Sequence, residues 1–328
     1  MTERENALLV YHHQKPQWTP NMLEAIYFTG FFSHNECGMR GERIKENIAV
    51  DCFGVEWIMD HGSPVPNPGK YILDDISNWR TLKFPEPKTY DWEAFAKVEL
   101  ADYDGTKLLT YFCEQGLFDR LTQLMGFENA LMALLEDPEE CMAFFERMVQ
   151  YKIELIECVA KYYKPDVFMY TDDIAKSDSL FMSPATYQEV IKPYHARIIQ
   201  AIKDNGMIAE QHTCGKYDAV VDDYVEIGIQ SLFPTQASND IVSIQKKHGD
   251  KAIVFGGFNS QGPCGYVDAD EATMREEARR MADTYAVNGN FIACPMIGDL
   301  FSPPTPQRLM QIGSFCDEFR KRCNELGI

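Results

Sequence analysis

Several features that mark common classes of protein are missing from this chain of 328 residues. No uninterrupted apolar run approaches the ~20 residues that a membrane-spanning helix requires, which argues against an integral membrane protein. Basic residues are in deficit, with 31 lysines and arginines against 50 acidic residues, and the net charge of −19 repels phosphate backbones and anionic membranes. We therefore expect neither nucleic acid nor a membrane as a partner.

Signatures of several enzyme classes are missing as well. No G-x-G-x-x-G or G-x-x-x-x-G-K-[ST] segment opens a helix, which argues against the phosphate-binding loops of doubly wound sheets. The chain has no G-x-S-x-G nucleophile elbow and no H-E-x-x-H pair. Hydrolysis by those two routes is therefore not expected.

The cysteines indicate a reducing environment. All ten are scattered without the spacing of a disulfide framework, so most should be small buried hydrophobes. The charged residues 1–6 lead into no apolar signal segment, and we expect a cytoplasmic protein. Apolar residues make up 45% of the chain, enough for a large core, and no low-complexity linker divides it.

The most informative feature that is present is the segment His212-Thr213-Cys214-Gly215, together with Cys294 much later in the chain. Each of these two segments follows a short apolar run. Imidazole nitrogen and thiolate sulfur are ligands that zinc favours, and three protein ligands with one open position are typical of a catalytic site. A single histidine or cysteine is more often structural, but together His212, Cys214 and Cys294 predict a zinc site.

From about residue 107 the sequence alternates apolar runs with amphipathic stretches, which predicts parallel strands joined by helical crossovers. We expect a single domain over 1–328, with an N-terminal extension and the first barrel elements in 1–106 and regular units in 107–328. Because several strands end in polar residues, the favoured fold is a (β/α)8 TIM barrel, with the N-terminal extension capping its mouth. The predicted strands are 107–113, 166–170, 206–211, 230–233, 252–255 and 291–293; the predicted helices are 117–135, 138–163, 183–204, 217–227, 240–248, 269–288 and 306–324.

Polar residues at the strand ends are candidates for the site. Asp172 and Asp173 follow Tyr170, and a pair of carboxylates facing one cavity would raise one pKa and create a proton donor. Neighbouring residues on a strand point in opposite directions, so one of the two should face the site while the other caps a turn. Weaker candidates for substrate binding are Glu114, Gln236 and Asn259, each of which could instead cap a helix or lie in a solvated loop.

The N-terminal third differs in composition from the rest of the chain. Residues 27–32 form a dense aromatic patch that includes Phe31, and residues 61–90 contain five prolines. Such segments are usually loops and caps on a scaffold, and their aromatic residues are usually core. The functional alternative is an apolar lid over the barrel mouth.

The chain resembles the uroporphyrinogen decarboxylase-like superfamily. The resemblance is carried by the His212–Gly215 step with Cys294, by the strand 169–173, by 182–184 with 192–194, and by 51–57. Within the superfamily these motifs are similar to the zinc-dependent, corrinoid-linked methyltransferases, which include coenzyme M methyltransferases and O-demethylases of anaerobes. The resemblance covers nearly the whole chain.

What the resemblance implies is methyl transfer from a small methyl donor to the Co(I) of a corrinoid carried by a separate protein. Zinc on His212, Cys214 and Cys294 would act as a Lewis acid on the leaving oxygen, and Asp172 or Asp173 would protonate it. The aromatic N-terminal patch and Tyr170 favour a methoxylated aromatic donor. Where related enzymes place a carboxylate near the metal, this chain has Gln236, which leaves the fourth ligand open.

Three alternatives remain. The reverse reaction would methylate a thiol such as coenzyme M, because zinc also lowers the pKa of a bound thiol. A non-catalytic zinc-binding protein could share the fold. Uroporphyrinogen decarboxylase itself works without a metal and grips substrate carboxylates with an arginine-rich N-terminal motif, whereas this chain has no arginine between Gln14 and Arg40.

Overall fold

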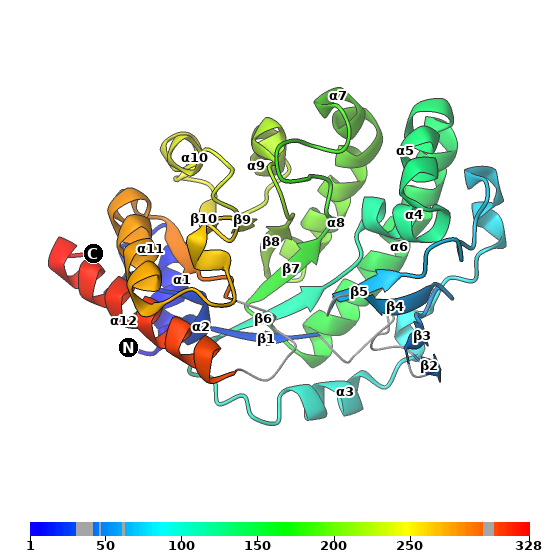
Figure 1. Cartoon of the computed structure of the whole chain (residues 1–328). Coiled ribbons are helices and arrows are strands. Elements are labelled where there is room, and N and C mark those ends of the chain that lie inside the picture. Colours follow the sequence, from blue (N-terminus) through cyan, green and yellow to red (C-terminus); the bar gives the residue numbers. More distant parts are fainter. Residues whose placement is uncertain (31–41, 46, 61–62, 298–304) are drawn as a thin grey trace.

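The computed structural model describes residues 1–30, 42–45, 47–60, 63–297 and 305–328. Its centre is a sheet of seven parallel strands that curls into part of a barrel within an α/β fold (Figure 1). Hydrophobic runs buried on both faces explain why these segments form the central sheet. In sheet order the strands are β1 (Ile26–Thr29), β6 (Leu108–Cys113), β7 (Val167–Thr171), β8 (Ile208–His212), β9 (Ser231–Thr235), β10 (Ile253–Gly257) and β11 (Phe291–Cys294).

Helices cover the outside of the sheet, and the alternation predicted from residue 107 onward is confirmed. The predicted helix 117–135 is in fact two helices, because Gly126 has a φ of 84° and ends the first. None of the described helices is long and apolar enough to cross a membrane. They are α1 (Glu3–Tyr11), α2 (Met22–Ala25), α3 (Trp92–Glu99), α4 (Leu117–Met125), α5 (Phe127–Glu136), α6 (Pro138–Tyr162), α7 (Pro184–Thr186), α8 (Lys192–Asp204), α9 (Val221–Glu226), α10 (Ile241–His248), α11 (Glu271–Thr284) and α12 (Pro306–Leu326).

An eighth barrel strand is not confirmed in the described residues. The first third of the chain supplies one strand, β1, to the parallel sheet, where the sequence led us to expect the remaining barrel strands. The segment just before β1 contacts the opposite edge of the sheet, since the Ala293 N–H donates to the Pro20 carbonyl at 3.0 Å and Asn21 forms a bridge with Ala293. The two edges therefore approach one another at this point.

Helix α1 packs against the interior of the curled sheet. It begins at the N-cap Thr2, whose side chain and that of Glu5 form a reciprocal capping box. Ala7, Val10 and Tyr11 are buried in the same apolar cluster as inward-facing residues of the strands. The resulting core lies inside the sheet and separates this end from the carboxyl ends of the strands.

A buried carboxyl group lies within this core. Glu210 of β8 is fully buried, and its Oε2 accepts hydrogen bonds from the Tyr11 hydroxyl at 2.8 Å and the Ser231 hydroxyl at 2.5 Å. Burial raises its pKa from the ordinary 4.5 to about 7, and the two hydrogen bonds only partly oppose this change. Near neutral pH the side chain is thus poised between its two charge states.

A second sheet is inserted between β1 and β6. Its four antiparallel strands are β2 (Glu42–Lys45), β3 (Ile48–Val50), β4 (Glu56–Asp60) and β5 (Ser63–Pro66). The segment 61–90, expected to consist of loops and caps, therefore also contributes an edge strand, and prolines are tolerated there because an edge strand has unpaired backbone groups. Two short 3-10 helices (Ile76–Thr81 and Pro87–Thr89) and α3 complete the insertion.

One buried ion pair joins this insertion to the barrel. The Asp51 carboxylate accepts from the Arg120 guanidinium of α4 at 2.5 Å, and both side chains are fully buried. Asp51 also accepts from two backbone N–H groups of its own turn and from the indole of Trp57 at 3.0 Å. The pair fixes the β3–β4 turn, and with it Trp57, against the start of the barrel helices.

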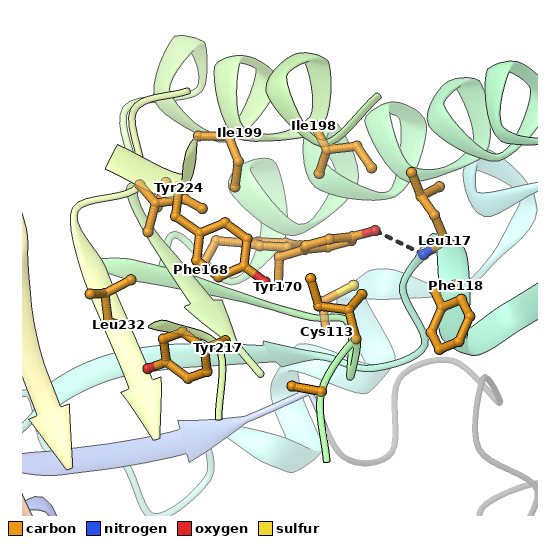
Figure 2. Close-up of a cluster of buried hydrophobic side chains, with 14 of the residues drawn as sticks. Cys113, Leu117, Phe118, Phe168, Tyr170, Ile198, Ile199, Tyr217, Tyr224 and Leu232 are labelled. Atoms are coloured by element: carbon orange, nitrogen blue, oxygen red, sulfur yellow. Dashed lines mark hydrogen bonds between the residues drawn. The ribbon is translucent and has the colours of Figure 1, made fainter. Parts of the chain in front are cut away.

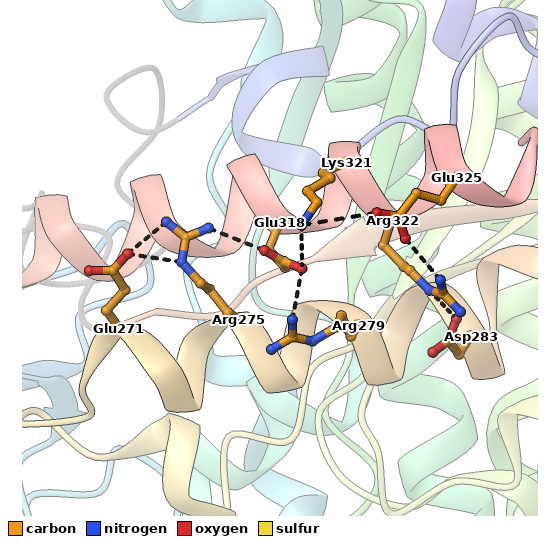
Figure 3. Close-up of polar contacts among 8 residues, drawn as sticks. All are labelled: Glu271, Arg275, Arg279, Asp283, Glu318, Lys321, Arg322 and Glu325. Atoms are coloured by element: carbon orange, nitrogen blue, oxygen red, sulfur yellow. Dashed lines mark hydrogen bonds and ion pairs between the residues drawn. The ribbon is translucent and has the colours of Figure 1, made fainter.

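Helices α11 and α12 lie side by side and are joined by a ladder of charges (Figure 3). At its centre the buried Glu318 carboxylate contacts Arg275 at 3.3 Å, Arg279 at 3.0 Å and Lys321 at 3.8 Å. The partners on α11 are partly exposed, so each contributes little on its own. This network differs in that respect from the enclosed pair of Asp51 and Arg120.

The buried Glu210 should make stability depend on pH. Its folded pKa is raised, so between pH 4.5 and about 7 the folded protein binds a proton that the unfolded chain releases. Stability should fall across this window as pH rises, by roughly 3 kcal/mol at most, and Glu210→Gln should remove that dependence. Urea unfolding of metal-free protein at pH 5 and pH 8 measures it; an equal pH dependence in both proteins would contradict this expectation.

The two charge networks should respond differently to truncation. Arg120→Ala leaves the Asp51 carboxylate buried without its cation, and we expect a loss of about 3–5 kcal/mol in the free energy of unfolding. Arg279→Ala, the matched control, removes a half-exposed partner and should cost less than about 1 kcal/mol. Similar losses in the free energy of unfolding for the two variants, measured by denaturant unfolding, would contradict the expectation that the buried pair contributes more than the exposed network.

Candidate functional site

Strand β7 divides its side chains between two environments. Phe168 and Tyr170 point outward into the apolar layer between sheet and helices, as Figure 2 shows. Met169 and Thr171 point inward and line a cavity at the carboxyl ends of the strands. Because successive strand residues alternate, Asp173 continues the inward set and also lines this cavity.

Asp172 continues the outward set and anchors a helix. Its carboxylate accepts from the backbone N–H groups of Leu117 at 3.0 Å, Phe118 at 3.2 Å and Asp119 at 2.9 Å, and from His195 Nε2 at 2.7 Å. Three free N–H groups and the positive end of the helix dipole make this a favourable place for a carboxylate. The structure thus assigns Asp172 to the start of α4 and does not bring it to the cavity.

Tyr170, the other candidate at this strand end, is also outside the cavity. It is fully buried, and its hydroxyl accepts a hydrogen bond from the Leu117 N–H at 3.1 Å (Figure 2). Burial and the charge of Asp172 raise its pKa well above its ordinary value. This side chain supports the same helix start as Asp172.

The strand-end cavity has a volume of about 420 Å³. Its apolar wall brings together β1, β4, β6 and β9 and consists chiefly of Phe28, Trp57, Phe112, Met169, Phe233 and Met296. Its polar residues include Glu114, Gln115, Asp119, Gln123, Asp173 and His212, and the described lining includes no lysine or arginine. A volume of this size holds a small organic ligand.

Two carboxyl groups meet in this cavity. The backbone N–H of Asp173 donates to Asp119 Oδ2 at 3.1 Å, and Asp173 Oδ1 accepts from the Cys214 N–H at 2.6 Å. Burial, followed by repulsion from Asp172 and Asp173, raises the pKa of Asp119 well above its ordinary value. Asp119 therefore favours its protonated form, which suits a proton donor.

His212, Cys214 and Asp173 form the described group of side chains that could hold a metal ion, with all three ligand atoms within 4.8 Å of one another. His212 Nε2 lies 3.5 Å from Cys214 Sγ and 3.9 Å from Asp173 Oδ1. Burial lowers the pKa of His212, which keeps the imidazole neutral as a metal ligand requires. The pKa of the Cys214 thiol is raised, first by burial and then by the two neighbouring carboxylates.

Cys294 lies apart from this group. Its Sγ contacts Met22 Sδ at 3.5 Å, and burial raises the pKa of the thiol well above its ordinary value, with further contributions from Glu210 and Cys214. For Cys294 to join His212 and Cys214 on one ion, its side chain would have to turn away from Met22.

The remaining predicted residues are divided among several places. Glu114 lines the strand-end cavity, whereas Gln236 accepts from the Gly215 N–H at 3.2 Å and supports the turn after Cys214. Asn259 lines a different cavity, of about 270 Å³, together with Cys264 and Arg280. Phe31 lies outside the described residues.

Several cavity residues could not be recognised from the sequence, above all Asp119 and Trp57. Asp119 was read as part of a helix, and only the anchoring of that helix on Asp172 brings it to the site. Trp57 lies in the inserted sheet, far from the regular repeats. Phe112 could have been found, because it alternates with the outward-facing Tyr111 and Cys113.

Comparison with known proteins supports the fold. The family model for uroporphyrinogen decarboxylase (URO-D) matches residues 45–308. A solved methyltransferase from Methanosarcina mazei aligns over 100% of both chains, with a TM-score of 0.65 and 13% sequence identity. A structure described as native KDPGal aligns over 71% of this chain and 79% of its own with a TM-score of 0.34 and 13% identity, which is too low to carry an argument. No curated protein sequence matches this chain significantly.

The His212–Cys214 pair should be required for metal binding. We expect wild-type protein to take up about one zinc ion per chain. His212→Ala and Cys214→Ser should each weaken binding by more than the roughly 10–100-fold that loss of an outer partner costs. Cys316→Ser, a half-buried thiol of α12, is the control and should bind normally. Metal content after dialysis against a zinc buffer measures this, and unchanged zinc in His212→Ala would contradict it.

Proposed function

Because this chain belongs to the uroporphyrinogen decarboxylase (URO-D) family, we propose that it is a zinc-dependent methyltransferase of that fold. It would move a methyl group from a methoxylated aromatic compound to the Co(I) of a corrinoid carried by a separate protein. The observation that carries the proposal is the His212–Cys214 pair at the polar end of an aromatic cavity. The methyltransferase from Methanosarcina mazei has the same fold over its whole length, and its activity is compatible with this reading.

The residues present fit a zinc ion. An imidazole and a thiol already lie within 3.5 Å of each other at the cavity, through His212 Nε2 and Cys214 Sγ. We propose His212, Cys214 and Cys294 as the ligands, since zinc prefers thiolate sulfur to carboxylate oxygen when both are at hand. Asp173 would then lie beside the ion, either as a group that donates or accepts a proton or as the fourth metal ligand.

The cavity wall supplies binding and orientation. Trp57, Phe112 and Phe233 present aromatic surface to a substrate ring, and rings of this kind pair with a contribution of about 0.5–1.5 kcal/mol beyond area burial. The imidazole of His212 packs against two of them, with centroid distances of 5.7 Å to Phe112 and 5.3 Å to Phe233. A methoxyl group on a ring held by this wall would lie near the metal-binding pair.

The carboxyl groups supply the proton. When the bond between methyl carbon and oxygen breaks, the electron pair stays on the oxygen, and Asp119 is the group most able to neutralise it. Bound zinc would supply Lewis acidity at the same oxygen. Asp173, whose side chain is 39% exposed and lines the same cavity, would exchange protons with solvent beside Asp119.

The described lining argues against three alternatives. A decarboxylase for a porphyrinogen rich in carboxylates would need cations to hold them, and none of the described lining residues is lysine or arginine. The same holds for a thiol acceptor that carries a sulfonate. If the zinc were purely structural, the acidic pair Asp119 and Asp173 and the aromatic wall would have no function.

The activity can be tested directly. We expect zinc-loaded protein to consume Co(I) corrinoid when a methoxyarene is added, seen as loss of the cobalt(I) absorption under anaerobic conditions. Asp119→Asn should lower kcat by about 10²-fold or more while zinc content is unchanged. Parallel assays with methylcobalamin and thiols, and with porphyrinogen, test the alternatives.

The control is Asp250→Asn, an exposed carboxylate in the turn before β10, at the opposite end of the strands. It should retain wild-type activity. Methylation of thiols without any demethylation of methoxyarenes would show that the methyl group moves from the corrinoid to a thiol, contrary to the proposed direction. Inactivity with every corrinoid and donor would overturn the proposal.

A further inference from the structure

The helical segment between β7 and β8 contains a turn that is wider than an α-helical turn. Tyr187–Ile191 is π-helical, and the N–H of Lys192 donates to the Tyr187 carbonyl, which is an i→i+5 bond. Pro193 follows and has no N–H to offer the carbonyl four residues before it, which explains why the α-helical pattern is interrupted here. Such π turns are rare and occur frequently at functional sites. The wider turn changes which side chains share a face of the helix.

The π turn brings Tyr187 and His195 onto one face. Two residues eight positions apart in a regular α-helix are separated by roughly 80° around its axis, because eight residues exceed two full turns. A turn closed by an i→i+5 bond takes up about one residue more and so removes this offset. The Tyr187 hydroxyl consequently lies 3.2 Å from His195 Nδ1, and both side chains are fully buried.

The two ring nitrogens of His195 have different partners. Nε2 lies 2.7 Å from Asp172 Oδ2, which already accepts from the N–H groups of Leu117 and Phe118, so His195 donates from Nε2. Nδ1 faces the Tyr187 hydroxyl. Burial raises the pKa of Tyr187 well above its ordinary value, so this hydroxyl keeps its proton and can donate it to Nδ1. An imidazole with its proton on Nε2 satisfies both contacts at once.

The Asp172 carboxylate passes this constraint to α4. Its Oδ2 accepts from the first two N–H groups of the helix, and its Oδ1 accepts from the Asp119 N–H at 2.9 Å. Among the described residues, His195 is the side chain that hydrogen-bonds to this carboxylate, whereas the other partners are backbone groups. Asp119, Thr122 and Gln123 share one face of α4, because residues at i, i+3 and i+4 are neighbours, and all three line the cavity.

We propose that His195 is a positioning residue of this site: it holds the Asp172 carboxylate, and with it the first turn of α4, so that Asp119 stays directed into the cavity. Tyr187 fixes the orientation of the His195 ring through Nδ1. The inference rests on the proposed function, in which Asp119 donates the proton, and it adds a residue that does not itself line the cavity. His195 therefore acts on the reaction only through Asp172.

Two carboxamide variants separate the hydrogen bond from the size and polarity of the side chain. In His195→Gln the amide nitrogen takes the place of Nε2 and can still donate to Asp172, whereas in His195→Asn it reaches only the place of Nδ1. We expect His195→Asn to lower kcat by about tenfold or more, since a misplacement of about 1 Å can cost roughly 10²-fold. The KM for the methoxyarene and the zinc content should be little changed. His195→Gln should retain most of the wild-type kcat.

Hydrogen exchange of backbone amides gives a second readout that needs no turnover. In zinc-loaded His195→Asn, the amides of residues 117–119 should exchange at least about tenfold faster than in wild type or in His195→Gln. The amides of β9 and β10 should exchange at the wild-type rate, because the expected change is a local opening of the helix start. A merely destabilising substitution would instead speed exchange in all of these elements.

Tyr187→Phe keeps the proposal testable if His195→Asn does not fold. This variant retains the ring and removes the hydroxyl that faces Nδ1. It should change kcat and the exchange of residues 117–119 in the same direction, by a smaller factor of at least about two. The matched control is Tyr194→Phe, which removes a hydroxyl from the same helix, where the ring packs against Phe145. It should leave both readouts unchanged.

The outcomes separate this inference from the proposed function. Faster local exchange in His195→Asn but not in His195→Gln, with no methyl transfer by any of the proteins, would support the positioning role and overturn the proposed reaction. Methyl transfer with kcat lowered equally in the two carboxamide variants, or in neither, would leave the reaction standing and overturn the positioning role. Exchange at residues 117–119 that is unchanged, or that rises together with exchange in β9 and β10, would also overturn it.

Discussion

The carboxylate of Asp172 is the fixed point about which the site is arranged. It lies at the end of β7, is fully buried, and accepts three backbone N–H groups from α4 and one N–H group from His195. The close approach requires Gly116 before the helix, because a Cβ there would come within 2.4 Å of Asp172. This anchoring sets where α4 starts, and so it delivers Asp119 to the cavity and Arg120 to Asp51.

Three kinds of element therefore contribute residues to the cavity: strands of the central sheet, helix α4 and the inserted sheet. Strand alternation directs Met169, Thr171 and Asp173 inward, and helix anchoring adds Asp119. The inserted sheet adds Trp57, held through Asp51. The candidate metal-binding pair, His212 and Cys214, lies at the end of β8, and the turn around Cys214 is held by hydrogen bonds to Asp173 and Gln236. The proposed binding surface, proton donor and metal ligands thus come from elements with separate structural supports.

Much of the regular region could be predicted from sequence because its strands and helices have distinct hydrophobic periods and its helices carry capping signals. The choice between Asp172 and Asp173 could not, since β7 is buried on both faces and hydrophobicity does not say which face is the interior. The inserted sheet was missed because its strands are short, β5 contains two prolines, and the sheet is secured by the long-range pair of Asp51 and Arg120. Nor does spacing alone tell whether the thiol of Cys294 faces Met22 or Cys214.

The central claim is that His212 and Cys214 hold a zinc ion at the polar end of the aromatic cavity. Anomalous diffraction at the zinc edge from crystals grown with zinc tests it most directly. We expect one strong peak about 2.3 Å from Cys214 Sγ and about 2.0 Å from His212 Nε2. A peak elsewhere, or none beside these two atoms in zinc-saturated crystals, would contradict the account.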